Sequence, residues 1–448
     1  MFKAVLQKLR NPHFINLVGN AIMSLLNMIQ VAILFNYLSM PDMGIWFFFQ
    51  GTISLVDTSR AGFLSTAFIT SYAGTTKERA ADVAGSAWYL SLIITAIIVM
   101  VNIGYIFSPW HVKDAGTDLI LKWIGVVFII TLPSFIASCV LQAEQRFDRL
   151  LIIRSVSTSI SIILIIVFIA LKKVTLMNVI YIGFVAGGVT GLMTVVTGWS
   201  RINTLINKTG TTVRALFNYG KYSIGTALGT NLFSTTDTYI INFTLGPSAL
   251  AIYNLGLRLM ELVEIPLRSF AATIIAPLAA AYNRGEKSYC IYLLKKYAGM
   301  TTILLLPIVA GSLAFAEVGV WIVDKHYLST PAANVLRIFM SFALLYPIER
   351  YMALTLDAIN QPRVNMIKLF FMVIGNLVGD FLGVYIFKSV YGIAFGTIIP
   401  VLIGYGIAYV YLQKYTQFTL KDTYKIGWDE TLKLLRGAKN MLRKKQTV

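Results

Sequence analysis

The sequence predicts an all-α integral membrane protein with about twelve transmembrane helices, arranged as two six-helix pseudo-symmetric bundles around a central cavity. First, 57% of its 448 residues are hydrophobic and only 13% are charged, whereas soluble domains have about 25% charged residues. Second, apolar segments of about 20 residues recur along the whole chain. Third, a stretch in the first half resembles a stretch in the second, which indicates an internal repeat.

Twelve apolar segments are long enough to cross a bilayer as helices, because about 20 residues span its hydrocarbon core. An even number of spans places both chain ends on the same side of the membrane. The predicted spans are Phe14–Leu38, Met43–Tyr72, Ala84–Phe107, Asp118–Gln142, Leu150–Leu171, Leu176–Gly198, Tyr219–Thr244, Ala249–Ala281, Cys290–Val323, Pro331–Ile359, Val364–Phe387 and Tyr391–Gln413.

Lysine and arginine concentrate in alternate connecting segments. The cation-rich segments contain Lys77, Arg79, Arg146, Arg149, Arg201, Lys208, Arg214, Lys221, Arg284, Lys287, Lys295, Lys296, Arg363 and Lys368. The opposite segments contain only Lys113, Lys172, Lys173, Lys325 and Lys388. By the positive-inside rule, the cation-rich side and both termini are expected in the cytoplasm. Membrane orientation thus explains the +18 net charge, and nucleic acid is not an expected partner.

The second and eighth predicted spans carry the internal repeat. LVDTSRAGFLSTAFITSYA at 55–73 aligns with LVEIPLRSFAATIIAPLAA at 262–280, so Asp57 corresponds to Glu264. Each half has six spans, so the halves share one orientation and a pseudo-two-fold axis along the membrane normal is expected. The predicted domains are an N-terminal bundle at 1–200, a cytoplasmic linker at 201–221, a C-terminal bundle at 222–413 and a basic amphipathic tail at 414–448.

The tail combines apolar residues at helical spacing with Lys and Arg between them. Such a helix is typical of segments that lie on the anionic inner leaflet, so membrane lipids are expected partners. A solvated basic tail is the alternative. The predicted apolar stripe consists of Trp428, Leu432, Leu435, Ala438 and Leu442.

Four charged residues interrupt the apolar eighth span. Arg258, Glu261, Glu264 and Arg268 are three or four residues apart, so they share one face of a helix. A charge at the bilayer centre costs about 2.5–3.5 kcal/mol. This face is therefore expected to look into protein or a watery cavity, with its opposite charges paired.

Two similar halves with charged helices in corresponding places indicate an alternating-access carrier, with its site near the membrane midplane. The planar guanidinium group binds phosphate through two parallel hydrogen bonds. The candidate substrate-binding residues are therefore Arg258, Arg268, Arg60 and Arg350. The candidates for gating or ion coupling are Asp57, for which Arg60 is the in-helix partner, and Glu261 and Glu264. The charges in spans two and eight sum to zero, so a structural or gating network is the alternative.

Asp237 in the seventh span and Asp380 in the eleventh have no obvious cation on their own helix. A buried carboxylate can take up a proton or sodium and couple transport to an ion gradient, although partner helices satisfy such groups equally well. No cofactor and no metal site are expected. Cys139 and Cys290 are far apart in or beside apolar segments, so both are predicted to be core residues.

The sequence resembles the polysaccharide-transport family of the multidrug/oligosaccharidyl-lipid/polysaccharide exporter superfamily. The resemblance rests on 217–259, FNYGKYSIGTALGTNLFSTTDTYIINFTLGPSALAIYNLGLRL, with a Tyr-Gly start, Asp237, a Leu-Gly turn and Tyr253. LFNYLSMPDMGIW at 34–46 is a weaker counterpart in the first half. The resemblance covers about residues 10–415 and says more about the family than about the substrate.

The resemblance implies a cavity lined by spans 1, 2, 7 and 8, with the arginines of spans 2 and 8 holding pyrophosphate. It also implies a flippase in the bacterial cytoplasmic (inner) membrane, not an enzyme, that moves undecaprenyl-pyrophosphate-linked oligosaccharide to the periplasmic leaflet. The products served would be surface polysaccharides such as lipopolysaccharide O-antigen, capsule or exopolysaccharide. The implied partners are the lipid-linked oligosaccharide, membrane lipids, and polysaccharide polymerase and assembly proteins.

Two other functions compete with the flippase. A multidrug cation antiporter of the same fold would favour acidic and aromatic residues in its cavity, and Arg258 and Arg268 count against it. A membrane polysaccharide polymerase or ligase would need a larger extracytoplasmic loop than any between the predicted spans.

Overall fold

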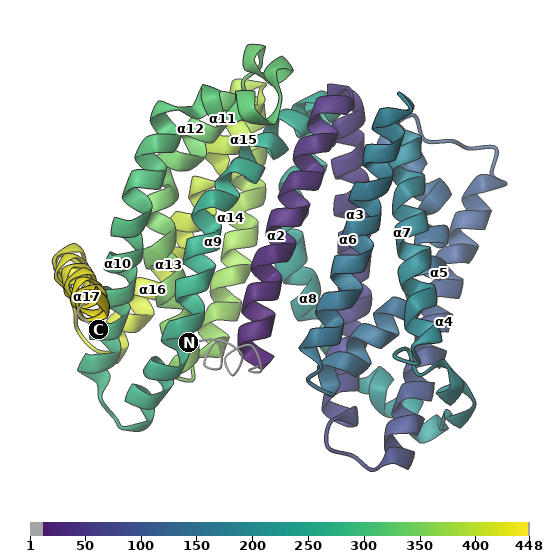
Figure 1. Cartoon of the computed structure of the whole chain (residues 1–448), viewed down its shortest axis with the longest axis horizontal. Helices are drawn as coiled ribbons and strands as arrows, with labels where there is room; N and C mark the ends of the chain where they lie inside the picture. The colour runs from purple at the N-terminus through teal and green to yellow at the C-terminus, as the bar shows by residue number, and fades with distance from the viewer. Residues whose placement is uncertain (1–11, 447–448) are drawn as a thin grey trace. The chain divides into compact units, whose positions relative to one another are not determined.

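The computed structural model describes residues 12–446, and within this range every regular element is a helix. The prediction of an all-α membrane protein is confirmed. The helices are α2 (Pro12–Tyr37), α3 (Met40–Tyr72), α4 (Lys77–Ile106), α5 (Ala115–Ala143), α6 (Phe147–Ala170), α7 (Leu176–Val196), η1 (Ile202–Asn207), α8 (Gly210–Leu245), α9 (Pro247–Asn283), α10 (Lys287–Ala314), α11 (Ala316–Val323), η2 (Lys325–Ser329), α12 (Ala332–Phe342), η3 (Ala343–Leu345), α13 (Tyr346–Ala358), α14 (Pro362–Phe387), α15 (Val390–Gly396), α16 (Ile398–Tyr415) and α17 (Thr423–Gln446) (Figure 1).

Each predicted span corresponds to helix in the structure, but three of the spans are interrupted. The ninth consists of α10 and α11, the tenth of α12, η3 and α13, and the twelfth of α15 and α16. In the tenth span, Pro347 stands in the first turn of α13. Proline has no N–H to donate to the preceding turn, so a helix tends to restart there.

Polar side chains cap the N-terminal ends of several helices. Ser39, Thr76, Asp114 and Thr175 each accept a hydrogen bond from a backbone N–H in the first turn of α3, α4, α5 and α7. These bonds satisfy N–H groups that have no partner inside the helix, which explains why the helices start at these residues.

Nine helical segments in the described range are long and apolar enough to cross a membrane, counting α12–α13 and α15–α16 as one segment each. Two of the other long helices, α3 with 33 residues and α8 with 36, are not among the nine. Both contain stretches rich in Ser and Thr, and α8 also contains Asn. Polar spanning helices avoid lipid contact, so α3 and α8 are the helices expected to border a polar interior.

The chain divides by its contacts into two compact units. Unit 1 runs to Asn242 and includes Gly246–Ala251, whereas unit 2 comprises Phe243–Leu245 and the chain from Ile252 onward. Residues 210–242 of α8 therefore belong to unit 1, although the sequence repeat assigns this helix to the second bundle. The bundle boundaries at residues 200–222 stay a prediction.

Unit 1 is built around contacts of α5 with α3, α4 and α7. Its core includes the fully buried side chains of Leu64, Phe68 and Ile136, with Trp88 and Val140 beside them. The Trp88 Nε1 atom donates to the Ser200 carbonyl oxygen at 2.7 Å, which ties the start of η1 to α4.

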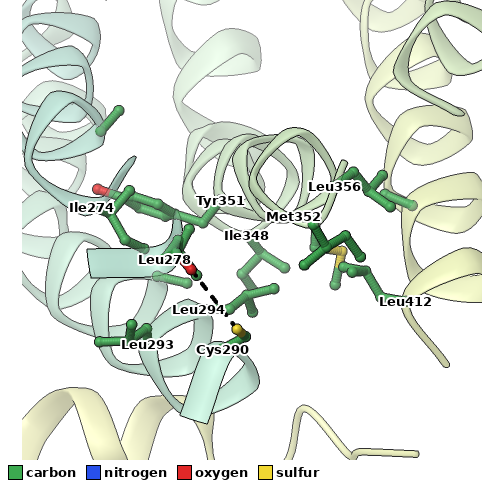
Figure 2. Packing of buried hydrophobic residues seen from close by; sticks show 14 of the residues in the cluster. Ile274, Leu278, Cys290, Leu293, Leu294, Ile348, Tyr351, Met352, Leu356 and Leu412 are labelled. Atoms are coloured by element: carbon green, nitrogen blue, oxygen red, sulfur yellow. Dashed lines mark hydrogen bonds between the residues drawn. The ribbon is translucent and has the colours of Figure 1, made fainter. Parts of the chain in front are cut away.

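The core of unit 2 lies where α9, α10, α13 and α16 meet (Figure 2). Ile274, Leu278, Leu294 and Leu412 are fully buried there, together with Cys290, whose Sγ lies 3.9 Å from the Leu278 carbonyl oxygen. Cys139 is buried in unit 1, and neither cysteine forms a disulfide. The prediction that both are core residues is confirmed.

The tail forms α17, which packs against α10 within unit 2 (Figure 1). The two helices approach closely because Gly299 and Gly427 face each other: a Cβ atom on Gly427 would lie only 2.3 Å from the Gly299 carbonyl carbon. Glu430 is buried at the contact, so this part of the tail is not free in solvent. Trp428, the first residue of the predicted stripe, is 54% exposed; the side chains of Leu435, Ala438 and Leu442 lie outside the described residues.

Candidate functional site

The four charges of α9 form two ion pairs along one helix. The Arg258 Nη1 atom lies 2.9 Å from Glu261 Oε1, and Arg268 pairs with Glu264 one turn further on. The predicted pairing of opposite charges is confirmed. The spacing of three and four residues explains both pairs, since such side chains are neighbours on a helix surface.

The charged face of α9 is opposite to its buried face. Leu259, Val263 and Leu267 alternate with the charged residues and are no more than 7% exposed. The Arg268 and Glu264 side chains are 58% and 50% exposed. The charges of α9 therefore lie on the face that is turned away from the core of unit 2.

A proline interrupts α9 within its second ion pair, between Glu264 and Arg268. Pro266 has no N–H, so the backbone hydrogen bond that this residue would donate to the Leu262 carbonyl oxygen is missing. A helix bends most readily where its hydrogen-bond ladder is interrupted. The backbone hydrogen-bond ladder between Arg258 and Arg268 is therefore weakest at 262–266.

In unit 1, Asp57 and Arg60 of α3 form the ion pair predicted from their spacing, at 2.5 Å between Oδ1 and Nη2. The Arg60 side chain is only 2% exposed, whereas the Asp57 side chain is 48% exposed. The Asp57 side chain therefore lies at the surface of unit 1, whereas the Arg60 side chain is buried. The predicted substrate-binding role of Arg60 requires its side chain to leave this position.

Two phenylalanines of α5 hold the Arg60 guanidinium. Its Cζ atom lies 4.6 Å from the centre of the Phe128 ring and 4.0 Å from that of Phe135, which is cation–π geometry. The Arg60 Nε and Nη1 atoms are buried without a hydrogen-bond partner in the described part of the chain. The prediction from sequence missed these two rings, although their seven-residue spacing puts both on one face of α5.

The polar helix α8 runs antiparallel to α3 within unit 1. Asn231 Nδ2 donates to Thr58 Oγ1 at 2.7 Å, and the Tyr239 hydroxyl donates to Thr52 Oγ1 at 3.1 Å. Asp237 lies between Asn231 and Tyr239 on α8 and is partly buried. Hydroxyl and amide groups thus connect the two polar helices α3 and α8.

Asp380 is fully buried on α14 in unit 2. Asn376, one turn earlier, donates from Nδ2 to Asp380 Oδ2 at 3.1 Å. The α15 backbone approaches the same carboxylate, because a Cβ atom on Gly396 would lie 3.1 Å from Asp380 Oδ1. A buried carboxylate is costly to keep charged. Binding of a cation compensates the charge, and binding of a proton removes it.

Arg350 is exposed on α13 and has no ion pair among the described residues. Its neighbour Glu349 pairs instead with Lys368 of α14 at 2.6 Å, and both of these side chains are largely buried. The prediction that Lys368 belongs to a cation-rich loop is wrong, because it lies in the second turn of α14 and neutralises a buried carboxylate. Arg350 keeps its positive charge available.

No three His, Cys, Asp or Glu side chains gather into a metal-binding group in the part of the chain that the structure describes. The charged groups of the candidate site in the described residues include the paired arginines of α9, the half-exposed Asp57 and the buried Asp380.

Comparison with known proteins identifies related sequences. A family model described as "Polysaccharide biosynthesis protein" matches residues 38–327. A probable low-salt glycan biosynthesis flippase of Haloferax volcanii, Agl15, is 24% identical over 238 residues, which cover 53% of this chain and 50% of that protein. The match spans about half the length of this curated relative.

Solved structures share the fold. The lipid II flippase MurJ in an inward closed conformation superposes with a TM-score of 0.70 at 15% identity, over 93% of this chain and 91% of that one. An inward-facing multidrug resistance MATE family transporter of the MOP superfamily gives 0.69 at 17% identity, over 89% and 96%. At these identities the likeness is one of fold alone.

Proposed function

The chain belongs to the polysaccharide biosynthesis protein family, and on that premise we propose that it is a flippase for a lipid-linked oligosaccharide. It moves an undecaprenyl-pyrophosphate-linked glycan from the cytoplasmic to the periplasmic leaflet by alternating access. The protein is a multi-pass membrane protein with a transporter fold. The proposal adds that it lies in the bacterial inner membrane with both termini in the cytoplasm and serves surface polysaccharide synthesis, including O-antigen.

The charged face of α9 is the observation that carries this proposal. Its two arginines each hold a carboxylate on a face that is turned away from the unit 2 core. A pyrophosphate group can replace Glu264 on Arg268, because phosphate oxygens accept the same parallel hydrogen bonds as a carboxylate. Such an exchange lets the site close without leaving a buried guanidinium unpaired.

The half-exposed Arg268–Glu264 pair is the one best suited to this exchange. Exposed ion pairs contribute only about 0–1 kcal/mol, so little is lost when a ligand separates them. The Arg258–Glu261 pair is less exposed and is assigned the role of a gate or second anchor. Arg350, which has no ion pair among the described residues, is a further cation for the substrate.

Two carboxylates on spanning helices, Asp380 and Asp237, are the candidates for coupling transport to an ion gradient. Asp380, with Asn376 as its hydrogen-bond donor, is proposed to take up a proton or sodium ion during the cycle. Asp237 on α8 is proposed for the same role in unit 1.

The expected result is that Asp380→Asn binds substrate but cycles at less than about a tenth of the wild-type rate, since one charge-assisted interaction is worth about 1.5–3 kcal/mol. A wild-type rate across a series of pH values and sodium concentrations would remove Asp380 from the coupling mechanism.

The decisive experiment locates the lipid-pyrophosphate oligosaccharide in cells depleted of this protein. It is expected to accumulate in the cytoplasmic leaflet, and surface glycan is expected to disappear. Complementation with Arg268→Gln should fail, whereas Arg284→Gln should succeed. Arg284 is the matched control, because it is also half-exposed and paired with a glutamate, Glu286, but lies in a connecting segment.

Other outcomes would redirect the assignment. A normal leaflet distribution in depleted cells contradicts the flippase, and efflux of organic cations would then test the antiporter. If the lipid-linked oligosaccharide reached the periplasmic leaflet normally but no surface polysaccharide was made, a polymerase or ligase would be indicated. Full complementation by both Arg258→Gln and Arg268→Gln would remove α9 from substrate binding.

A further inference from the structure

A polar pocket lies at one end of unit 1, apart from the charged face of α9. Its volume is about 340 Å³, and it is formed by the C-terminal ends of α5 and α7, the first turn of α6 and the start of η1. The polar residues that line it include Glu144, Arg149, Trp199, Arg201 and Asn203. The distribution of Lys and Arg predicts that this end of the unit is cytoplasmic.

The two arginines in this pocket differ in their partners. The Arg149 guanidinium lies over the Trp199 ring, 5.4 Å from its centre, and has no ion pair among the described residues. Arg201 Nη2 bonds to Glu144 Oε1 at 2.9 Å, and the Tyr72 hydroxyl donates to the same oxygen at 3.0 Å. The residues that line the pocket include one carboxylate and two guanidinium groups, so its charged lining is net positive.

The backbone at the pocket is held in an unfavourable conformation. Arg201 has φ of 51°, in the left-handed region, which costs a residue with a side chain about 1 kcal/mol or more. Gly198, just after α7, has φ of 71°, a conformation that glycine adopts without strain. The tight turn from Gly198 to Arg201 brings the Arg201 side chain back to Glu144 at the rim of the pocket.

We propose that this pocket binds a phosphate anion, carried either by the headgroup of a membrane lipid or by a soluble phosphate. Arg149 supplies a fork of donors that no carboxylate occupies, and Asn203 adds an amide. Arg201 can turn from Glu144 to the ligand, because that pair is 49% and 29% exposed and therefore weak. Both arginines also counter the negative ends of α5 and α7, and the positive N-terminal end of α6 favours an anion.

This site is independent of the proposed flippase. It uses none of the charged residues of α9, and its occupancy is measured without transport. The chain offers a matched control in Arg146, three residues before Arg149. Arg146 is exposed, pairs with Asp148 through two bonds of 3.1 Å and does not line the pocket.

The test uses the full-length protein and the fluorescence of Trp199. Binding of an anion to Arg149 is expected to shift the guanidinium on the indole ring and change its emission. Inorganic phosphate is titrated at constant ionic strength in detergent, and the protein is compared in phosphatidylcholine nanodiscs with and without phosphatidylglycerol. The variant Trp199→Phe identifies the part of the signal that comes from this residue.

The expected result is saturable binding that Arg149→Gln weakens about tenfold, because one charge-assisted interaction is lost. Arg201→Gln is expected to weaken it similarly, and Arg146→Gln to leave it unchanged. A response to phosphatidylglycerol identifies a lipid headgroup as the source of the phosphate, and a response to inorganic phosphate alone identifies a soluble ligand. Absence of both responses, or an equal loss in Arg146→Gln, overturns the proposal. Unchanged thermal unfolding of the variants shows that any loss of binding is not a loss of fold.

Discussion

At the residue scale, the unequal exposure of Asp57 and Arg60 decides what each can do. A buried guanidinium is stable only with compensation, and here one carboxylate and two aromatic rings supply it. The Asp57 side chain is 48% exposed, so it does not depend on Arg60 alone for compensation of its charge. Neutralising the two partners is therefore expected to have different consequences.

Asp57→Asn is expected to destabilise the protein by about 3 kcal/mol, because it leaves a buried cation without its carboxylate. Arg60→Leu is expected to cost less than about 1 kcal/mol, since Asp57 can be hydrated and leucine packs against Phe128 and Phe135. Thermal or denaturant unfolding in detergent measures both. The double variant should recover most of the stability lost in Asp57→Asn. Equal losses in the two single variants would show that Phe128 and Phe135 do not compensate the buried Arg60 charge.

At the element scale, helices approach one another where glycines face glycines. The α17–α10 contact depends on Gly427 and Gly299, and the α14–α15 contact on Gly383 and Gly392. Backbones that touch leave no room for a Cβ atom. Substitution at these positions therefore tests the packing of an element without changing any charge.

Gly427→Ala is expected to detach α17 from α10, because the new methyl group would overlap the backbone at Gly299. Faster proteolysis within 423–446 of the folded protein is the measurement. Gly406→Ala is the matched control, since no atom lies within 4 Å of a Cβ atom built on Gly406 of α16. If α17 is equally resistant in both variants, the glycine contact does not hold it.

The docking of α17 is also expected to depend on pH. Hydrogen bonds from Lys296 and Lys433 lower the pKa of Glu430 from 4.5 to about 2. A lowered carboxylate pKa stabilises the folded state above the unfolded-state value and loses that effect as the pH falls toward 2. Docking should therefore weaken by about 1–3 kcal/mol between pH 4.5 and pH 2. The same proteolysis assay measures it, and Glu430→Gln should show weaker docking with no such pH dependence.

At the scale of the whole molecule, membrane orientation follows from the summed positions of the cations. The segment between α3 and α4 is predicted to be cytoplasmic, and the segment between α4 and α5 extracytoplasmic. The exposed side chain of Trp110, at 83%, makes the second segment easy to label. Thr75 and Trp110 therefore provide a pair of reporter positions on opposite sides.

A cysteine at position 110 is expected to react with a membrane-impermeant maleimide in intact cells, and a cysteine at position 75 only after permeabilisation. Cys139 and Cys290 are buried and should give little background. Reaction at both positions in intact cells, or the reverse pattern, would contradict the predicted orientation.

The sequence by itself determined features that depend on one helix at a time. The apolar spans follow from hydrophobicity and length, and the Arg258–Glu261, Arg268–Glu264 and Asp57–Arg60 pairs follow from the geometry of a single turn. The family resemblance likewise needs only the order of residues. None of these features requires knowledge of which helices are neighbours.

Only the tertiary structure decided which side chains from different helices meet. It brings Phe128 and Phe135 of α5 onto Arg60, and Trp199 onto Arg149. It also pairs Glu349 with Lys368, leaves Arg350 exposed, and packs α17 against α10. These contacts join residues far apart in the chain, and they depend on how close the backbones come. That distance is set by packing over whole helix faces, which periodicity along one helix does not contain.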